Sequence, residues 1–560
     1  MEWLFNMKSD IEIAHEAALQ NIQNIASSIG IDAEQIEQYG KYKAKVNFTI
    51  DDAKVAKGNL ILVTATTPNK SGSGKTTTSV ALAQGLNKIG KKAIVALREP
   101  SLGPCFGMKG GAAGGGYSQV LPMEDINLHF TGDFHAITSA NNMLAALIDN
   151  YQYYNKSTPN GLKQVLWRRV LDVNDRSLRY IVSGLNGSAN GIPTETGFDI
   201  TPASEIMAIF CLSVSLDDLR NKIENILVGY KYDNTPFYVR DLGVAGAIVT
   251  LLKDAFLPNL VQTIEGGAAF IHGGPFANIA HGCNSIMATK AALQFGNYAV
   301  TEAGFGSDLG GEKFLNIKCR LAGIAPKATV LVTTTQSIKL HGNVDEKLIK
   351  QPNMEGLKAG IKNVARHIEN LQQFGQTVIV ALNKFGFDTD EEVNFIENWC
   401  KEMGAEFAIN EGFALGGNGA TSLAQKVVDV VENKPSKPIQ HTYNLDDSIE
   451  DKIKKIVTTV YKGKSVSFGK AALTSLKKIK ELGAEGLPVC IAKTQFSFTE
   501  NASQVGAAEG FNIHIENVIL NSGAGFIVAV AGEIMRMPGL PKEPAAKIID
   551  VVNGEIVGLS

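Results

Sequence analysis

The sequence has no apolar run that approaches the roughly 18 residues of a membrane-spanning helix. It also lacks a charge excess: 53 Lys and Arg residues against 56 Asp and Glu residues leave a net charge of −3, which excludes a broad basic surface for nucleic acid. The opening residues, Met1 to Met7, are too few and too acidic for a signal peptide. We therefore expect a cytoplasmic protein whose partners are neither membranes nor nucleic acids.

Cysteine is scarce, and no two cysteines form a recognisable pair. The six residues contain no C-x-x-C spacing, which favours buried free thiols in a reducing compartment over a zinc or redox site. They are Cys105, Cys211, Cys283, Cys319, Cys400 and Cys490. Carboxylates and histidines gather between Glu124 and His135, but without the spacing of zinc ligands. A loop with polar substrate contacts is the preferred interpretation there.

Glycine, in contrast, is abundant. The 56 glycines, together with 44% hydrophobic and 19% charged residues, are typical of a globular α/β enzyme with many backbone-lined loops. A chain of 560 residues is too long for one ordinary core. Because apolar runs of strand length alternate with helical patterns, we predict a P-loop NTPase-like parallel sheet with helices on both faces, plus two smaller α/β domains.

One stretch combines a strand, a glycine-rich turn and a helix. The apolar run 60–66 precedes Asn69-Lys70-Ser71-Gly72-Ser73-Gly74-Lys75-Thr76, and helical spacing begins at Leu82. This order is typical of a phosphate-binding loop, in which backbone N–H groups and a helix N-terminus surround an anion. Lys75 would place a charge on the outer phosphates, and Thr76 would offer a hydroxyl to Mg²⁺. The stretch therefore predicts an ATP site.

The match to this loop is incomplete. Its first position is Asn69 where the full pattern has glycine, so an ordinary strand-to-helix turn is the alternative. A dinucleotide-binding turn is excluded, because its third glycine would fall at Thr77. Asn383 to Asp388 only roughly resembles the guanine-binding N-K-x-D motif, whose aspartate would have to stand at Gly386. Guanine specificity is therefore excluded as well.

A second buried strand, predicted over 91–97 and parallel to the first, delivers Arg98 and Glu99. Because ligands bind beyond the carboxyl ends of strands in open α/β sheets, we expect both side chains to face the same cleft as Lys75. An arginine in that position can hold a carboxylate or phosphate through two hydrogen bonds. The alternative is a surface salt bridge between the two neighbours.

Two phenylalanines also follow predicted strands. Phe385 comes after a strand at 377–382, and Phe413 after one at 406–409. Such a pair could enclose a flat ring, although core packing is the more frequent role of phenylalanine.

Two helices have clear patterns. A repeat of four and three residues predicts a helix over 357–371. Ser9 and Glu12 form a capping box that begins a helix predicted over 9–29.

Several longer stretches share a further property. They are Leu97 to Pro104, the glycine run 109–117, and the segments 122–133, 272–285 and 301–313. In these stretches the chain resembles the formate–tetrahydrofolate ligase (10-formyltetrahydrofolate synthetase) family, and the resemblance extends from Ser9 to Ser560. We expect three domains, of residues 1–365 with an insertion at about 134–205, residues 366–448 and residues 449–560.

The resemblance implies a two-step ligation. ATP would phosphorylate formate to formyl phosphate with Mg²⁺ shielding the phosphates, and N10 of tetrahydrofolate would then attack the formyl carbon and expel phosphate. It also implies that Lys75 stabilises the transferred phosphoryl group, that Arg98 holds formate, and that Phe385 and Phe413 cover the folate ring. Members of the family respond to K⁺ or NH₄⁺, for which Glu99 is a candidate ligand, and they assemble as homotetramers.

Two positions depart from the family pattern. Ser73 stands where many relatives have glutamate, and Phe413 where they commonly have tryptophan. Because phenylalanine has a smaller stacking face, we expect weaker pterin binding, by about 0.5–1.5 kcal/mol. Three alternatives stay open: a P-loop ATPase switch that changes partners with nucleotide state, another carboxylate ligase that forms an acyl phosphate, and a non-catalytic family member.

Overall fold

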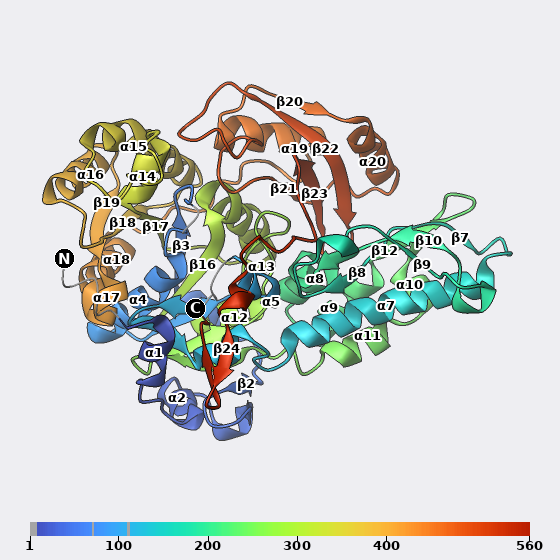
Figure 1. Ribbon diagram of the computed structural model, residues 1–560, viewed down its shortest axis with the longest axis horizontal. Helices are drawn as coiled ribbons and strands as arrows, with labels where there is room; N and C mark the ends of the chain where they lie inside the picture. Colours follow the sequence, from blue (N-terminus) through green and yellow to red (C-terminus); the bar gives the residue numbers. More distant parts are fainter. Residues whose placement is uncertain (1–7, 70–71, 109–112, 560) are drawn as a thin grey trace.

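The centre of the molecule is one large sheet, shown in Figure 1 for the computed structural model, which describes residues 8–69, 72–108 and 113–559. Its strand order is β1 (Ile36–Gln38), β2 (Ala44–Val46), β14 (Asn259–Thr263), β15 (Ala268–Ile271), β4 (Ala93–Leu97), β16 (Tyr298–Gly306), β3 (Asn59–Ala65), β17 (Ala328–Thr333), β18 (Val378–Asn383) and β19 (Glu406–Asn410). Every pair from β15 to β19 is parallel, and the strands before β15 pair antiparallel. β5 (Gly114–Gly115) pairs with β6 (Ser118–Leu121), which joins β14.

The parallel strands are buried on both faces, which is why they read as continuous apolar runs. Leu60 and Leu62 of β3 belong to one hydrophobic cluster, and Ile61 and Val63 belong to another. The first cluster also contains the apolar residues of α12 (Ile286–Phe295) and α15 (Met354–Gln373), and the second those of α4 (Lys75–Lys88) and α18 (Thr421–Asn433). The predicted α/β class with helices on both faces is confirmed, and the sheet is mostly, not wholly, parallel. The P-loop NTPase-like arrangement stays a prediction.

Smaller helices and a terminal hairpin complete this part of the molecule. They are α3 (Asp52–Lys57), α5 (Leu102–Phe106), α6 (Met123–Asn127), α13 (Cys319–Ala322), α14 (Thr335–His341), α16 (Asp390–Glu402), α17 (Gly412–Leu415), and the strands β24 (Asp550–Val552) and β25 (Glu555–Val557).

The predicted helix over 9–29 is wrong, although its capping box is present. The structure has two short helices there, α1 (Asp10–His15) and α2 (Ile22–Ser28). Between them the backbone N–H of Gln20 donates to Oε1 of Gln262 on β14, at 2.9 Å, and the Asn21 side chain caps α2. Tertiary contacts and a second cap therefore override the helical periodicity.

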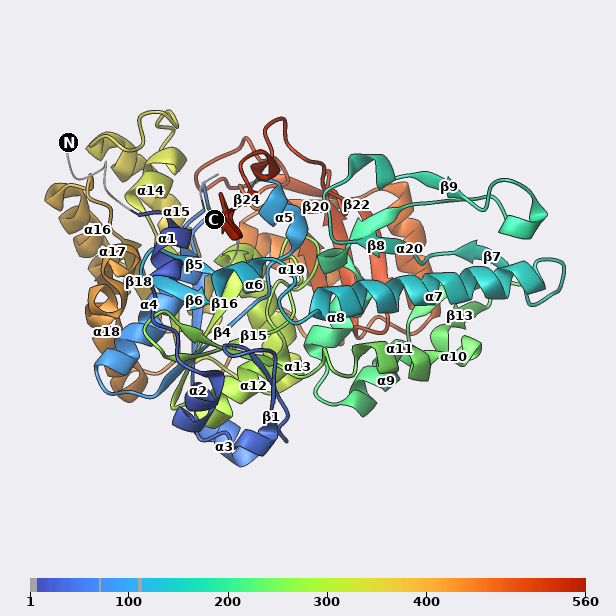
Figure 2. The same cartoon turned by 60° about the horizontal axis from the view of Figure 1, so that its bottom comes forward.

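One segment projects away from the sheet along the long helix α7, as Figure 2 shows. Its elements are α7 (Asp133–Asn155), β7 (Leu162–Val165), β8 (Arg169–Leu171), β9 (Ile181–Ser183), β10 (Thr194–Thr196), β11 (Phe198–Ile200), α8 (Glu205–Leu212), α9 (Leu216–Glu224), β12 (Leu227–Lys231), β13 (Pro236–Tyr238), α10 (Val239–Leu242) and α11 (Ala245–Leu252). We call it the projecting segment.

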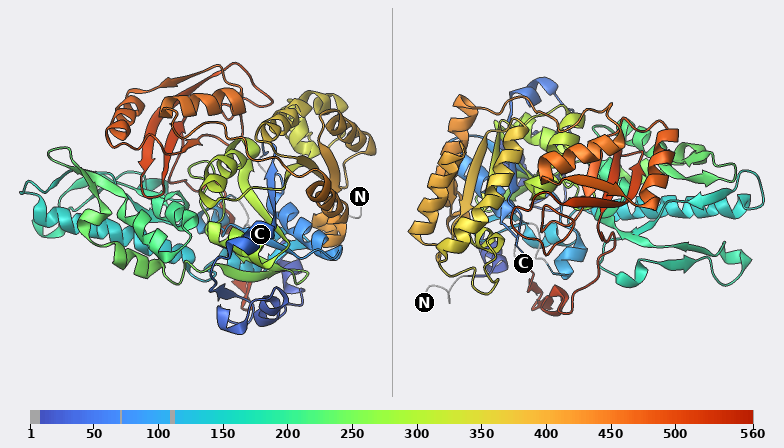
Figure 3. Two further views of the ribbon diagram at one scale, coloured as in Figure 1. Left: turned by 180° about the vertical axis from the view of Figure 1, so that it is seen from behind. Right: turned by 90° about the horizontal axis from the view of Figure 1, so that it is seen from above.

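A second sheet forms near the C-terminus, in the order β20 (Ser465–Phe468), β22 (Asn512–Asn521), β23 (Phe526–Ala531) and β21 (Val489–Ala492). It carries α19 (Ile449–Ile456) and α20 (Lys470–Glu481) and lies beside the projecting segment (Figure 3). The expected boundary at residue 365 falls inside α15, and β18 and β19 continue the central sheet. The division into three domains stays a prediction.

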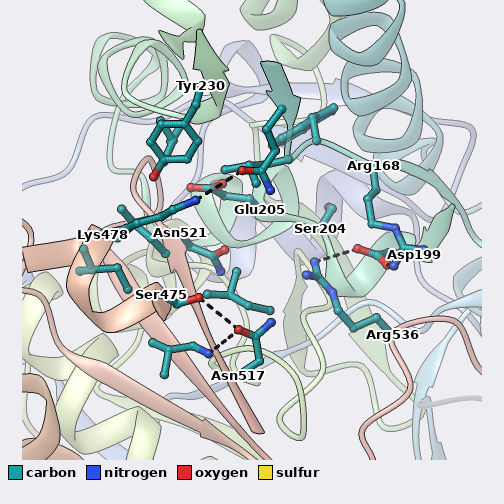
Figure 4. Close-up of a pocket in the computed structure, with 18 of the residues that line it drawn as sticks. Arg168, Asp199, Ser204, Glu205, Tyr230, Ser475, Lys478, Asn517, Asn521 and Arg536 are labelled. Atoms are coloured by element: carbon teal, nitrogen blue, oxygen red, sulfur yellow. Dashed lines mark hydrogen bonds and ion pairs between the residues drawn. The ribbon is translucent and has the colours of Figure 1, made fainter. Parts of the chain in front are cut away.

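A cavity of about 340 Å³ lies between the projecting segment and the C-terminal sheet and is lined by residues of both (Figure 4). Glu205 lines it at the start of α8, and its Oε1 accepts hydrogen bonds from the N–H groups of Gly523 (2.8 Å) and Ala524 (3.2 Å) in the turn between β22 and β23. Beside it, Asp199 pairs with Arg168 at 3.0 Å and Arg536 at 2.8 Å. Polar contacts therefore tie the two parts together.

Glu205 is expected to make stability pH-dependent. Burial raises the pKa of this carboxyl from its ordinary value of 4.5 to about 7, so folding favours the protonated form. Its stabilising contribution is complete below about pH 4.5 and is lost as the pH rises through about 7. This difference in pKa corresponds to about 3 kcal/mol of unfolding free energy.

Glu205→Gln, measured by thermal unfolding from pH 5 to 8, should therefore gain stability relative to wild type as the pH rises. The exposed Glu195→Gln should keep the wild-type profile, and parallel profiles for wild type and Glu205→Gln would contradict the assignment.

Candidate functional site

The predicted phosphate loop lies between β3 and α4, as the strand–turn–helix pattern requires. Gly74 caps α4 with a φ of +71°, in the left-handed region that glycine tolerates best. A Cβ at Gly74 would also lie 2.6 Å from Nδ2 of Asn383. Lys75 is the first residue of α4, whose N-terminal N–H groups and dipole favour an anion. Lys70 and Ser71 lie outside the described residues, so the structure gives the loop only on either side of them.

Gly74→Ala is expected to destabilise the fold because of the left-handed backbone at this position and the close approach of Asn383. The matched control is Gly90→Ala, because Gly90 has a similar φ of +78° but no atom within 4 Å of an added Cβ. Left-handed strain alone should cost each variant about 1–2 kcal/mol of unfolding free energy. An added Cβ at Gly74 would displace the Asn383 amide and break its hydrogen bond to the Ser73 carbonyl. Gly74→Ala should therefore lose more stability than the control and should also bind Mg·ADP more weakly, as measured by calorimetry. Equal stability losses and equal nucleotide affinities in the two variants would show that the close approach has no effect.

Glu302, a carboxylate that the sequence patterns did not indicate, joins the loop to Arg98. Thr76 Oγ1 donates to Oε2 of Glu302 at 2.8 Å, and Nη2 of Arg98 lies 3.7 Å from Oε1 of the same residue. Glu302 is buried, with 3% of its surface exposed. It reaches this position because β16 lies between β3 and β4 in the sheet. Glu302 thus links Thr76 to Arg98, a contact that the sequence did not indicate. That Arg98 and Glu99 face the same cleft as Lys75 stays a prediction.

The glycine-rich loops enclose the guanidinium group of Arg98. Its Nη1 donates to the carbonyl of Pro275 at 3.1 Å, and its Nε is buried without a hydrogen-bond partner among the described residues. A Cβ at Gly304 would lie 3.0 and 3.2 Å from the two terminal nitrogens. Glycine at 304 therefore leaves the room that the guanidinium needs. Arg98 keeps 21% of its side chain exposed, which leaves a side open to a small anion.

Glu99 lies in a different environment from its neighbour. It is buried beside Asp133, which pairs with Lys45 at 2.5 Å, and its Oε2 has no hydrogen-bond partner within the described residues. Burial, and then the negative charge of Asp133, hold the pKa of Glu99 well above its usual range, while Lys45 acts in the opposite direction. A buried carboxyl oxygen without a hydrogen-bond partner is suited to be one ligand of a bound hard cation, because hard cations prefer oxygen ligands.

Asn383 is a second residue whose role was missed. Its Nδ2 donates to the carbonyl of Ser73 at 2.9 Å, and its Oδ1 accepts from Thr78 Oγ1 at 2.9 Å and from Asn410 Nδ2 at 2.6 Å. The asparagine that resembles a guanine-binding motif in sequence therefore holds the phosphate loop. The sequence places it after a strand, but the pairing of that strand was needed to find the contact.

Phe385 and Phe413 keep 38% and 42% of their surfaces exposed, so core packing does not describe either ring. Phe385 stacks on Phe387 with ring centroids 5.3 Å apart and planes 4° apart. Phe413 lies against the glycine run, where a Cβ at Gly115 would come within 3.1 Å of its ring. Both follow adjacent parallel strands, β18 and β19, and so lie at the same edge of the sheet as the loop.

The cysteines have structural surroundings. All six are buried and unpaired, as predicted. Cys283 donates its Sγ hydrogen to the backbone carbonyl of His281 at 3.2 Å, and burial raises its pKa to about 11, which argues against a nucleophile. Within the described ranges, no group of three or more His, Cys, Asp or Glu side chains is arranged to hold a metal ion. No helix there is long and apolar enough to cross a membrane.

Comparisons with known proteins point in one direction. The family described as "Formate--tetrahydrofolate ligase" matches residues 8–560. Proteins named formate–tetrahydrofolate ligase from Bacteroides fragilis and Bacteroides thetaiotaomicron are each 62% identical to this chain over 555 residues, which is 99% of the chain and 100% of each relative. A protein of the same name from Campylobacter concisus is 53% identical over 556 residues, covering 99% of the chain and 100% of the relative.

Proposed function

Because the chain belongs to the formate–tetrahydrofolate ligase family, we propose that it is an ATP-dependent enzyme of one-carbon metabolism that ligates formate to tetrahydrofolate. The products would be 10-formyltetrahydrofolate, ADP and phosphate. The observation that carries this proposal is the carboxylate of Glu302, which contacts both Thr76 at the phosphate loop and Arg98 at the end of the neighbouring strand. A nucleotide phosphate at the loop and a small carboxylate at Arg98 would then lie close together.

In the first step, an oxygen of formate attacks the γ-phosphorus of ATP, the bond to the β–γ bridging oxygen breaks, and formyl phosphate and ADP form. Arg98 orients the formate oxygen, since its guanidinium is held by Pro275 and Glu302. Lys75 and the N-terminus of α4 stabilise charge on the transferred phosphoryl group. The hydroxyl of Thr76 and the carboxylate of Glu302 are oxygen donors that suit Mg²⁺, which would shield the phosphates.

In the second step, N10 of tetrahydrofolate attacks the formyl carbon, the carbon–oxygen bond to phosphate breaks, and the amine loses its proton. The exposed faces of Phe385 and Phe413 are suited to hold the flat pterin ring next to the loop. We place the ring there because both phenylalanines follow strands that end beside the loop.

The size of the aromatic ring at position 413 is expected to affect the affinity for tetrahydrofolate. Phe413→Trp should lower the KM for tetrahydrofolate by about 2- to 12-fold, equivalent to about 0.5–1.5 kcal/mol, because the indole offers a larger stacking face. Initial rates at saturating ATP and formate measure this. The matched substitution Phe387→Trp changes the ring that packs on Phe385 and should not lower the KM. An unchanged or higher KM for Phe413→Trp would contradict the stacking role.

Three further properties belong to the same proposal. Glu99 supplies an oxygen ligand for K⁺ or NH₄⁺, and Glu99→Gln should then weaken activation in a K⁺ titration. The protein assembles as a homotetramer, for which light scattering should give four times the 59.9 kDa chain mass. It acts in the cytoplasm, where cell fractionation should locate it.

The test of the proposed function is an omission assay. With Mg·ATP, formate and tetrahydrofolate together, 10-formyltetrahydrofolate and phosphate should appear in equal amounts, and leaving out any one substrate should stop both. Phosphate release without formate and folate would instead favour an ATPase switch. Equal turnover with acetate in place of formate would favour a ligase for larger acids.

A further inference from the structure

A chain of side-chain amides connects the phosphate loop to the segment that carries Phe413. The N–H of Gly412 donates to Oδ1 of Asn410 at 3.2 Å, Nδ2 of Asn410 donates to Oδ1 of Asn383 at 2.6 Å, and Nδ2 of Asn383 donates to the carbonyl of Ser73 at 2.9 Å. Each asparagine therefore accepts with its oxygen and donates with its nitrogen. The chain runs without a gap from the residue before Phe413 to the residue before Gly74.

The fold supports this chain at both ends. Asn383 and Asn410 are register partners at the ends of β18 and β19, so the two amides are adjacent whenever the strands pair. At the loop end, Thr78 Oγ1 lies 2.9 Å from both the Gly74 carbonyl and Oδ1 of Asn383. At the other end, Ser118 Oγ donates to the Gly412 carbonyl at 2.8 Å.

Most of this hydrogen-bond chain is poorly accessible to water, although Asn383 itself is half-buried. Asn410 and Thr78 are buried, with 3% and 0% of their surfaces exposed. Hydrogen bonds in such surroundings are stronger than in water and polarise one another along a chain. A ligand that orders the carbonyl of Ser73 therefore also favours the bonded arrangement at Gly412, and the reverse holds equally.

We propose that Asn383 and Asn410 are positioning residues that couple the two substrate sites, so that nucleotide at the phosphate loop and tetrahydrofolate at Phe413 each increase the affinity for the other. The inference rests on the proposed function, because it takes the nucleotide and folate positions from it. Neither asparagine is assigned a contact with a reacting atom.

The test measures the dissociation constant of Mg·ADP by calorimetry, without formate, in the absence and presence of saturating tetrahydrofolate. In the wild type, tetrahydrofolate should lower this constant at least about fivefold, which is the lower end of typical coupling. Asn410→Asp replaces the donor that faces Asn383 with an acceptor, and the ratio should fall to about one. The matched control is Asn370→Asp, because Asn370 is equally buried but donates to the Val460 carbonyl, and it should keep the wild-type ratio.

Hydrogen exchange on the wild type gives a second measurement that does not depend on the variant folding. Tetrahydrofolate alone should slow amide exchange in residues 72–82, and Mg·ADP alone should slow it in residues 410–416. The inference would be overturned if amide exchange changed in neither segment. It would also be overturned if tetrahydrofolate left the dissociation constant of Mg·ADP unchanged in the wild type, or if Asn410→Asp kept the same ratio of dissociation constants as the wild type. Product formation by the wild type separates the outcomes: if product forms but the ratio is one, only the coupling fails, and if neither product nor folate binding is found, the proposed function fails with it.

Discussion

Lys75→Ala is expected to lower kcat/KM for the complete ligation by about 10²–10³-fold, equivalent to about 3–4 kcal/mol of transition-state stabilisation. The reason is the position of Lys75 as the first residue of α4, directly after the left-handed Gly74. In the proposed first step, charge would accumulate on the transferred phosphoryl oxygens, and Lys75 would stabilise it. Initial rates with saturating formate and tetrahydrofolate measure the effect.

The control for this substitution is on the same helix. Lys88 lies at the other end of α4, where it pairs with Glu265 at a distance of 3.4 Å on the surface. Lys88→Ala should leave kcat/KM within about twofold of wild type, because exposed pairs contribute little. If Lys75→Ala retained activity within a few-fold of the wild type, the glycine-rich turn would be an ordinary loop, and ATP would have to bind elsewhere.

Arg98→Lys should lower kcat/KM for formate by about 10²-fold while leaving the dissociation constant of Mg·ADP within about twofold. Lysine keeps the positive charge beside Glu302, so it avoids leaving that buried carboxylate unpaired, but it loses the planar group that offers two hydrogen bonds to a carboxylate. Misplacing the attacking oxygen by a small distance is enough to cause a loss of this size. Formate titrations at saturating ATP and tetrahydrofolate measure it.

A matched arginine separates this effect from a general loss of stability. Arg320 donates to the carbonyls of Asn316 and Tyr443, at 3.1 and 3.0 Å, and is given no role in the reaction. Arg320→Lys should therefore keep the formate kinetics of the wild type. An unchanged kcat/KM in Arg98→Lys, or a loss confined to nucleotide affinity, would mean that formate binds away from Arg98.

The sequence predicted the central strands well because they are buried on both faces. The run 60–66 corresponds to β3 (Asn59–Ala65), and the predicted strand at 377–382 corresponds to β18 (Val378–Asn383). The helix over 357–371 lies within α15, whose apolar residues repeat as one stripe. In each case a single local pattern, a continuous apolar run or a helical repeat, agrees with the tertiary environment.

Local sequence patterns do not reveal which distant strands pair in the sheet. The insertion of β16 between β3 and β4 places Glu302 at the loop, and no spacing in the sequence gives that order. Asn383 was noticed only for a motif that it does not complete, because its contact with Ser73 depends on how β18 is placed in the sheet. The break at Gln20 in the predicted first helix has the same origin, since its partner, Gln262, lies far along the chain.

The most direct test of the central claim follows the oxygen atoms of formate. With formate labelled by ¹⁸O at both oxygens, one labelled oxygen should appear in each phosphate released, and the other should stay in the formyl group of 10-formyltetrahydrofolate. Mass spectrometry of the two products measures this directly. Phosphate that carries one ¹⁸O per product formed would show that a formate oxygen bonds to the transferred phosphorus, as the acyl phosphate requires. Unlabelled phosphate, formed in equal amount with 10-formyltetrahydrofolate, would contradict the acyl phosphate and with it the roles given to Lys75 and Arg98.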